Sequence, residues 1–556
     1  MNKAWWHNSV VYQIYPKSFQ DSDGDGVGNI KGIISRLDYL KDLGINVIWI
    51  CPIYKSPMVD HGYDISDYYQ IDPSFGTMED MELLLKECKE REIKVLMDLV
   101  INHTSDKHPW FEKAMEDLDS DYADYYIIKE GKDGNPPNNW RSIFGGSAWE
   151  KIGDTNKYYL HLFTKAQPDL NWENKELRSE LYEMVNYWLE KGLGGFRVDA
   201  ISHIKKDFSY VNLPADGPDG LVDAWEYYKN TTGIEVFLNE LKEKTFKIYD
   251  SMTVAEADIK EVDRLVDFIG ENGCFSTVFD FCHTIYNVND EKWKDKPIKM
   301  VNEIREKLFK KQLGAAKYGF LSNFIENHDL PRCVNRFIPE KEISFYSESM
   351  LGTLYFFLRG IPFIYQGQEI GMTDFPKKSI NEFLDLATYQ NYEKYLGKGL
   401  TEKEALKRIN IECREHSRTP FQWNSGENAG FTSGAPWFEI NPNYKCINMK
   451  EQEDRENSLL TYYKRLISLR KNEEYKETFI YGDIIPAFNE YDGIISYERK
   501  NAKQRVLVIN NCSNKPSIIK FKENVKQILL NNYNDIVLKG KNLELLPYQS
   551  IVLELN

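Results

Sequence analysis

The sequence predicts an α/β fold: a (β/α)8 TIM barrel with an inserted loop-rich domain after strand 3 and a C-terminal antiparallel β-sandwich domain. Three observations predict it. Short runs of β-branched and aromatic residues recur eight times before residue 370, and segments with helical periodicity lie between them. After about residue 477 the pattern changes to short alternating strands. A chain of 556 residues is also long enough for two or three domains.

The eight candidate strands have the near-continuous apolar character of strands that are buried on both faces. They occupy residues 10–16, 47–50, 94–100, 195–200, 253–257, 276–281, 320–329 and 361–367. Apolar residues recur at helical spacing between them, most clearly over 78–92 and 175–192. Eight buried strands joined by helices are typical of a (β/α)8 barrel.

Two long polar segments interrupt this alternation, one after the third strand and one after the eighth. Both should therefore rise at the C-terminal face of the barrel. The predicted domains are the first part of the barrel (1–104), an inserted domain B (105–174), the second part of the barrel with a subdomain at about 374–455 (175–476), and a C-terminal β domain (477–556).

Charge and cysteine usage exclude several classes of protein. The net charge is −16, from 70 basic and 86 acidic side chains, and this argues against a nucleic-acid partner. We find no signal peptide and no apolar run long enough to span a membrane. The eight cysteines are scattered without a CxxC pair, which is typical of a reduced, cytoplasmic protein. Monomer and homodimer both stay open.

Acidic and histidine side chains recur at the ends of four predicted strands, where barrels of this type place their catalytic groups. They are Asp98 and His103, Asp199, Glu256, and His328 with Asp329. A single acid at a strand end more often caps a helix. Four such strand ends are harder to explain in that way, because buried charges are costly unless something pairs or uses them.

The carboxylates indicate a class of reaction. Arg197 lies two residues before Asp199 on the same side of the strand and should favour the ionised carboxylate, which suits a nucleophile. Motifs for zinc proteases, phosphate loops, serine hydrolases and dinucleotide binding are missing from the sequence. Paired carboxylates facing one cavity suit glycoside hydrolysis.

At these residues the chain resembles glycoside hydrolase family 13, the α-amylase superfamily, over essentially its whole length. The segments that carry the resemblance are DLVINH (98–103), GFRVDA (195–200), VAEA (254–257) and FIENHD (324–329). QPDLNW (167–172), YQGQEIGM (365–372), SRTPFQW (417–423) and the segment 10–33 resemble the oligo-1,6-glucosidase and α-glucosidase subgroup.

The resemblance implies a role for each matching residue. Asp199 resembles the nucleophile, Glu256 the general acid/base and Asp329 the transition-state stabiliser. The residues implied to bind substrate are Asp60 and Tyr63 around the terminal glucose, His103 and His328 on its hydroxyl groups, Arg197 beside the nucleophile, Phe144 on the acceptor side, and Arg418 as the pocket arginine, with Arg414 as its rival.

Two positions depart from the subgroup pattern. Ala200 follows the nucleophile, where members that prefer α-1,6 links have Val and those that cleave α-1,4 links often have Ala or Thr. His61 stands where relatives usually carry Asn or Asp. Strict isomaltose specificity is therefore not implied, and maltose and sucrose stay open as substrates.

The function implied is that of a retaining, exo-acting α-glucosidase that releases terminal glucose from short α-glucosides, a small-oligosaccharide substrate. The two long insertions predict a blind-ended pocket. A sucrose isomerase or other transglycosidase, or a trehalose-6-phosphate hydrolase, of the same subgroup is the alternative. A non-catalytic, transporter-associated relative is a third interpretation, and the three carboxylates and the lack of a membrane segment argue against it.

The stretch DSDGDGVGN (21–29) predicts a site for a hard cation with oxygen ligands. Its spacing resembles an EF-hand loop, but Gly32 replaces the bidentate Glu and the loop follows a strand. The candidate ligands are Asp21, Asp23, Asp25, the Val27 carbonyl and Asn29, with Ca²⁺ expected first and Mg²⁺ second. The resemblance supports a structural metal in this loop, and a solvated acidic turn is the alternative.

Overall fold

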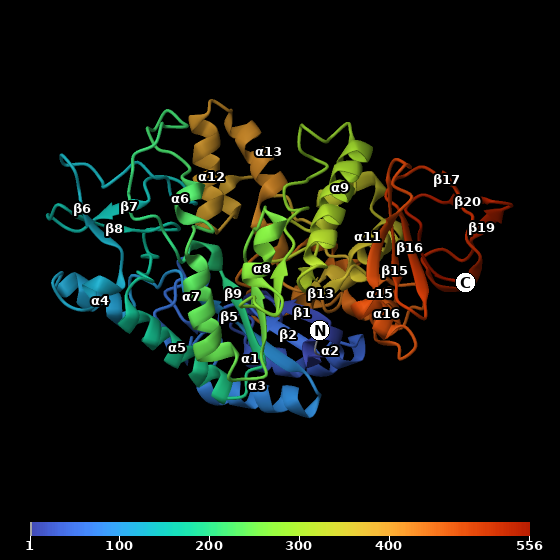
Figure 1. The fold of residues 1–556 in the computed structure, drawn as a ribbon, viewed down its shortest axis with the longest axis horizontal. Helices are drawn as coiled ribbons and strands as arrows, with labels where there is room; N and C mark the ends of the chain where they lie inside the picture. Colours follow the sequence, from blue (N-terminus) through green and yellow to red (C-terminus); the bar gives the residue numbers. More distant parts are fainter. Residues whose placement is uncertain (1–2) are drawn as a thin grey trace.

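A computed structural model, which describes residues 3–556, closes the eight predicted strands into one parallel barrel (Figure 1). The strands are β1 (Val11–Ile14), β2 (Val47–Ile50), β5 (Lys94–Val100), β9 (Gly195–Asp199), β10 (Met252–Ala255), β11 (Thr277–Phe279), β12 (Phe320–Asn323) and β13 (Gly360–Tyr365). Their order around the barrel is β1-β13-β12-β11-β10-β9-β5-β2. The predicted (β/α)8 fold class is confirmed.

Six of the eight strands end earlier than the sequence pattern predicts, and two of these differences concern catalytic candidates. β12 ends at Asn323, although the predicted strand runs to residue 329, and β10 ends at Ala255. The pairing of β10 with β9 ends at Ala255, and the pairing of β12 with β13 ends at Asn323. Glu256 and Asp329 therefore lie on loops just past the strand ends.

Helices follow the strands as the alternation predicts. Their bounds are α1 (Ile30–Ser35), α2 (Leu37–Leu43), α3 (Met78–Glu90), α5 (Lys175–Glu190), α6 (Trp225–Tyr228), α7 (Ile234–Leu241), α8 (Leu265–Phe268), α9 (Pro297–Ala315), α10 (Cys333–Phe337) and α11 (Phe345–Phe356). α3 illustrates why they form: Thr77 and Asp80 make a capping box, and Met81, Leu84 and Cys88 recur on its buried face.

The segment between β5 and α5 contains α4 (Pro109–Glu116) and a small antiparallel sheet in the order β6-β8-β7. These strands are β6 (Ile128–Glu130), β7 (Trp149–Lys151) and β8 (Lys157–Leu160), at the left of Figure 1. Trp140 in this segment packs with Val222, from the loop after β9, and with Tyr228 of α6. Arg141 binds Asp223 of that loop at 3.0 Å and also pairs with Asp216 and Asp219.

The segment after β13 folds into a helical hairpin of α12 (Leu386–Gly397) and α13 (Glu402–Glu412). A short 3₁₀ helix, Arg414–Arg418, follows directly and turns the chain back under the hairpin. The chain then continues through α14 (Met449–Glu453), α15 (Leu459–Lys471) and α16 (Lys476–Tyr481). In the part of the chain from residue 3 onwards, no helix is both long and apolar enough to cross a membrane.

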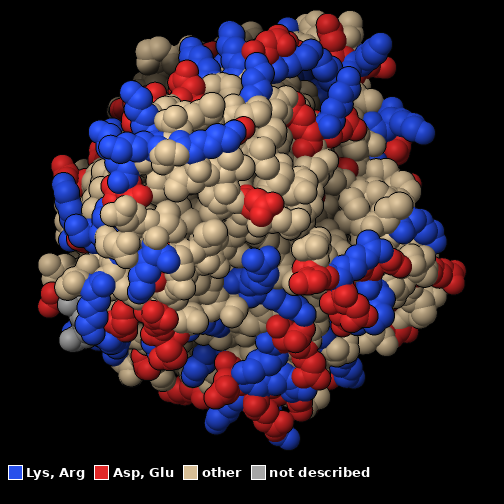
Figure 2. Space-filling view, turned by 90° about the vertical axis from the view of Figure 1, so that its right-hand side faces the viewer, with Lys and Arg blue, Asp and Glu red and all other residues tan. Residues whose placement is uncertain are grey.

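The C-terminal region is antiparallel, as predicted, and lies at the right of Figure 1. One sheet has the order β14-β15-β16-β21-β18, formed by β14 (Asp483–Ala487), β15 (Ile494–Lys500), β16 (Arg505–Asn511), β21 (Ser550–Leu555) and β18 (Val525–Asn531). The other has the order β17-β20-β19, formed by β17 (Ser517–Lys520), β20 (Asn542–Leu545) and β19 (Val537–Lys539). A shared apolar core joins residues of both sheets. Viewed from this side, charged side chains surround a broad region that is mostly uncharged, with an acidic side chain near its centre (Figure 2).

Candidate active site

A cavity of about 380 Å³ opens at the C-terminal end of the barrel strands. Eight predicted site residues line it: Asp60, Tyr63, His103, Phe144, Asp199, Ala200, Glu256 and Asp329. The rest of the wall comes from the two insertions: Ile143 and Phe163 from the first, and Ala387, Thr388, Asn391, Ile409, Glu412, Cys413 and Arg414 from the second. Walls from both insertions are what a blind-ended pocket requires.

Arg197 lies beneath this cavity and joins three carboxylates. Its Nη1 atom lies 2.6 Å from Asp199 Oδ1, and its Nη2 atom lies 2.8 Å from Glu256 Oε1. It also forms an ion pair with the fully buried Asp98 of β5. The sequence offered Glu256 no neighbouring cation, and the fold supplies one because β9 and β10 are adjacent. One guanidinium thus holds Asp199 and Glu256 close together.

Three carboxylates share the one Arg197 guanidinium, so the charge balance favours one proton retained within the group and does not require Asp199 to hold it. Burial raises the pKa of Asp199 well above its ordinary value, Glu256 and Asp98 add to the rise, and Arg197 opposes it. Burial likewise raises the pKa of Asp98 to about 6, against the effect of Arg197. The expectation that Arg197 by itself keeps Asp199 ionised therefore left out burial and the neighbouring acids.

Asp329 has the opposite electrostatic environment. Burial acts to raise its pKa, but His328, Arg414 and Arg418 outweigh burial and hold the pKa well below its usual range. Arg418 Nη2 lies 2.9 Å and Arg414 Nη1 lies 3.2 Å from Asp329 Oδ1. Asp329 is therefore ionised throughout the ordinary pH range, which suits a group that stabilises developing positive charge.

The two predicted histidines lie at different depths. His103 lines the cavity, with its Nε2 atom 3.1 Å from Gln167 Nε2, and Gln167 also donates to Asp60 Oδ2 at 3.1 Å. His328 lies behind Tyr63, whose hydroxyl is 2.6 Å from His328 Nε2. Burial lowers the pKa of His103 to about 4 and that of His328 to about 3. Both rings are therefore neutral hydrogen-bonding groups near pH 7.

Of the two candidate pocket arginines, Arg418 and its rival Arg414, it is Arg414 that lines the cavity. The Arg414 Nη2 atom lies 2.9 Å from Asp60 Oδ1. Arg418 is 1% exposed and lies beneath, where it donates to the His328 carbonyl at 2.8 Å. Asp385, which caps α12, pairs with both arginines. The Arg414 guanidinium also lies 5.6 Å from the centre of the Phe144 ring.

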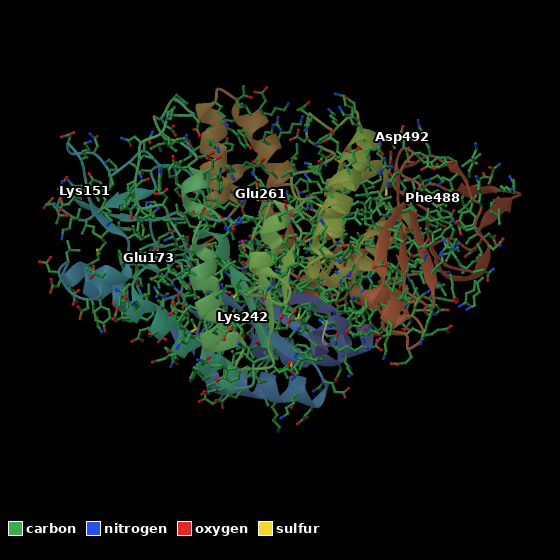
Figure 3. All side chains as sticks on the ribbon, viewed as in Figure 1. Lys151, Glu173, Lys242, Glu261, Phe488 and Asp492 are labelled. Atoms are coloured by element: carbon green, nitrogen blue, oxygen red, sulfur yellow. The ribbon has the colours of Figure 1, made fainter. Side chains whose placement is uncertain are left out.

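A buried lysine anchors the loop that carries His103. Lys206 Nζ lies 2.7 Å from Asp169 Oδ2 and 2.9 Å from Asn102 Oδ1, and the side chains of Lys206 and Asp169 are fully buried. This contact ties the loop after β9 to the ends of β5 and of the inserted segment. Lys205, next in sequence, instead pairs near the surface with Glu173, which is labelled in Figure 3.

The two departures from the subgroup pattern both have left-handed backbone conformations. Ala200 has φ 43° and donates its N–H to Glu256 Oε2 at 2.8 Å. His61 has φ 51°, a conformation in which Asn, Asp and His are enriched among non-glycine residues. This backbone requirement explains why His can stand at a position that usually holds Asn or Asp. His61 is outside the cavity lining, and its Nε2 atom lies 4.0 Å from Asp385.

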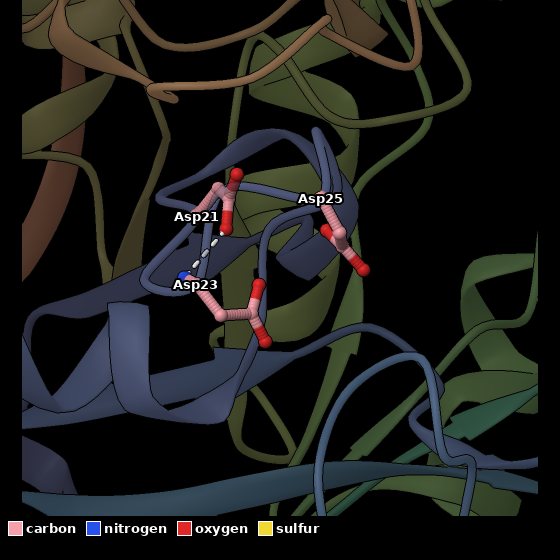
Figure 4. A group of neighbouring side chains, drawn as sticks. All are labelled: Asp21, Asp23 and Asp25. Atoms are coloured by element: carbon pink, nitrogen blue, oxygen red, sulfur yellow. Dashed lines mark hydrogen bonds between the residues drawn. The ribbon is translucent and has the colours of Figure 1, made fainter.

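The acidic loop brings Asp21, Asp23 and Asp25 together, with one oxygen of each within 4.8 Å of the others (Figure 4). Burial and the two neighbouring acids raise the pKa of Asp23. Carboxylate oxygens crowded in this way fit a hard cation such as Ca²⁺ or Mg²⁺. The Asn29 side-chain oxygen caps α1 through Gly32 N at 2.8 Å.

Val27 lies in the same loop, and its N–H donates to Asp25 Oδ1 at 2.8 Å. A one-turn 3₁₀ helix, Pro16–Ser18, separates β1 from the loop, so the loop does not follow the strand directly. This turn is too short to be the entering helix of an EF-hand. Asp21 N donates to the Phe431 carbonyl at 3.1 Å, so the loop is tied to the segment after the hairpin.

Sequence reasoning missed several residues around the cavity. Gln167 lies inside the quoted motif QPDLNW, and its position in that motif could have identified it. Asp385 and Glu412 carry no local signal. They reach the site only because the α12–α13 hairpin folds back over the barrel, which the sequence pattern does not specify.

Comparison with known proteins agrees with this geometry. Residues 13–478 match the family model of the α-amylase catalytic domain, and residues 494–552 match that of the α-amylase SusG C-terminal domain. The chain is 42% identical to the oligo-1,6-glucosidase of Bacillus cereus over the full length of both. Its structure is similar to those of Bacillus licheniformis trehalose-6-phosphate hydrolase (40% identity, TM-score 0.90) and Klebsiella sp. LX3 isomaltulose synthase (38%, 0.93), each with full coverage of both chains.

The matched catalytic domain covers more than half of the chain and includes every residue of the cavity. The chain belongs to the α-amylase family of glycoside hydrolases, glycoside hydrolase family 13.

Proposed function

We propose that the protein is a retaining, exo-acting α-glucosidase that releases terminal non-reducing glucose from isomaltose, isomalto-oligosaccharides and related short α-glucosides. The observation that carries this proposal is the Arg197 bridge between Asp199 and Glu256 at the floor of a cavity walled by both insertions. Retaining glycosidases need two carboxyl groups roughly 5–5.5 Å apart. The 42% identity to an oligo-1,6-glucosidase supports the same substrate class.

The proposed reaction is a double displacement. Asp199 attacks the anomeric carbon while Glu256 gives its proton to the glycosidic oxygen, so the C–O bond to the leaving sugar breaks as the glucosyl–Asp199 ester forms. Glu256 then takes a proton from water, which attacks the same carbon and releases glucose. Each step inverts the anomeric carbon, and the product retains the α configuration.

The remaining residues hold the terminal glucose. Asp60, Arg414 and Asp329 form a connected charged group, and His103 and Gln167 extend it with neutral hydrogen bonds. Because these donors and acceptors are already in place, little free energy is spent on ordering them when the transition state forms. Phe144 and Phe163, with ring centres 5.7 Å apart, supply an apolar surface against the sugar.

An initial-rate panel tests the proposed substrate class. Isomaltose, maltose, sucrose, trehalose 6-phosphate and dextran are compared at equal concentration, with products identified by chromatography. We expect a short neutral α-glucoside to be the best substrate and glucose the main product. Isomaltulose or trehalulose from sucrose would indicate an isomerase, the alternative supported by the likeness to isomaltulose synthase. Dextran as the best substrate would contradict a blind-ended pocket.

We further propose that Asp21, Asp23 and Asp25 bind a structural Ca²⁺, with Mg²⁺ as second choice, and that the Val27 carbonyl and Asn29 complete the site. The cation would neutralise three acids and tighten the contact between this loop and the segment near Phe431. Its role would be stability, because none of the three acids lines the catalytic cavity.

Chelation should therefore lower the melting temperature more than it lowers turnover at mild temperature. A cation present at 100 times its dissociation constant stabilises a folded protein by about 2.7 kcal/mol. Differential scanning calorimetry and initial rates, each with EDTA and with added Ca²⁺, measure both effects. Asp23→Asn with Asp25→Asn is the control and should no longer respond to either addition. Immediate loss of activity at an unchanged melting temperature would contradict a structural role.

We propose a cytoplasmic location and a monomeric or homodimeric state. All eight cysteines are free, which suits a reducing compartment.

A further inference from the structure

The α12–α13 hairpin presents two polar side chains to the catalytic cavity for which no role has been assigned. Asn391 of α12 and Glu412, the last residue of α13, line the same cavity as Asp199 and Glu256. Ala387 and Asn391 are four residues apart and so share one face of α12. Both polar residues are exposed, whereas Tyr63 and His103 deeper in the cavity are at most 6% exposed. Asn391 and Glu412 therefore lie at the opening.

The packed hairpin fixes the backbone that carries these two residues, and a hydrogen bond orients the Glu412 side chain. An apolar core joins α12 to α13 and contains Phe383, Tyr392, Ala405, Ile409 and Cys413. The Tyr395 hydroxyl of α12 donates to Glu412 Oε1. Among the described residues 3–556, Glu412 Oε2 and the Asn391 amide have no hydrogen-bond or ion-pair partner. One oriented carboxylate oxygen and one amide therefore face the opening unpaired.

The positions of the two sugars in the proposed reaction decide what Glu412 and Asn391 would contact. The proposed function places the terminal glucose against Asp60, Arg414 and Asp329. The sugar that leaves must lie on the open side. We propose that Glu412, oriented by Tyr395, and Asn391 bind hydroxyl groups of the leaving sugar. This inference rests on the proposed α-glucosidase function and names the residues that select its second sugar.

The charge of the cavity wall extends the inference to the kind of leaving sugar. Five carboxylates line the cavity, those of Asp60, Asp199, Glu256, Asp329 and Glu412, and Arg414 is the one permanently charged cation among the described lining residues. A carboxylate is a good acceptor for sugar hydroxyl groups and repels an anion. The opening therefore suits a neutral sugar and disfavours a phosphorylated one.

The test compares substrates with and without a leaving sugar. Isomaltose and maltose have one, and α-D-glucosyl fluoride does not. We expect Glu412→Ala to lower kcat/KM for the better disaccharide by roughly tenfold or more, mainly through KM, because hydrogen bonds to charged groups are worth about 1.5–3 kcal/mol. Turnover of the fluoride should stay unchanged. Tyr395→Phe should have a smaller effect of the same kind.

Glu393→Gln is the matched control, because Glu393 is exposed on the same hairpin outside the cavity lining, and it should leave both substrates unaffected. Glu412→Gln should raise the rate on trehalose 6-phosphate relative to that on the disaccharide. Equal loss on disaccharide and fluoride, no loss on either, or a wild-type preference for trehalose 6-phosphate would each overturn the inference. A wild type that turns over neither disaccharide nor fluoride would instead overturn the proposed function and, with it, this inference.

Discussion

Asp199→Asn is expected to abolish turnover of α-glucosides, on the order of 10⁴-fold or more in kcat, without unfolding the protein. The amide has the shape of the carboxylate but is too weak a nucleophile to form the glucosyl ester. Arg197 keeps Asp98 and Glu256 as partners in this variant. Removing one of three crowded carboxylates also relieves repulsion, so the melting temperature should not fall.

Initial rates with isomaltose and thermal unfolding measure the two halves of this prediction. The smaller Asp199→Ala variant adds a chemical test, because azide can enter the space that the carboxylate leaves. Azide should restore cleavage of α-glucosyl fluoride and give β-glucosyl azide, since it attacks from the face that Asp199 occupied. Near-normal activity of Asp199→Asn would show that another residue is the nucleophile.

Lys206→Met should cause the largest loss of stability among the substitutions considered. It leaves the fully buried Asp169 carboxylate without its cation, and breaking a buried ion pair on one side costs about 3–5 kcal/mol. Asn102 also loses its hydrogen bond to Lys206, and His103 follows Asn102 directly. We therefore also expect a higher KM, because His103 lines the cavity.

Denaturant unfolding of the wild type and three variants isolates the buried pair. Lys206→Met combined with Asp169→Asn should be more stable than Lys206→Met alone, because the neutral amide no longer needs a cation. Lys205→Met is the control, since its ion pair with Glu173 is near the surface and such pairs are worth about 0–1 kcal/mol. Equal losses of unfolding free energy in Lys205→Met and Lys206→Met would show that the buried pair stabilises the protein no more than a surface pair does.

The barrel was predictable because each strand carries its own signal. Every predicted strand contains or overlaps an observed one, since β-branched runs buried on both faces differ clearly from the helices between them. The strand ends were not predictable to the residue. β12 stops at Asn323, where its pairing with β13 ends, and no local pattern of the 320–329 segment marks that point.

The site, like the barrel, has features that the sequence predicts and features that it does not. Asp199, Glu256 and Asp329 each lie near the end of a predicted strand, and the fold brings them into one cavity. The ion pair between Arg197 and Glu256 depends on β9 and β10 being neighbours, and the position of Arg414 in front of Arg418 depends on a 3₁₀ turn. Such relations between distant segments decide charge balance, and they cannot be read from the spacing of residues along the chain.

The configuration of the first sugar released tests the central claim most directly. Proton NMR during hydrolysis of isomaltose, recorded before mutarotation, distinguishes α-glucose from β-glucose. Two displacements at the anomeric carbon, with Asp199 and Glu256 held together by Arg197, predict α-glucose as the first product. Initial formation of β-glucose would mean a single displacement by water and would contradict the nucleophilic role of Asp199.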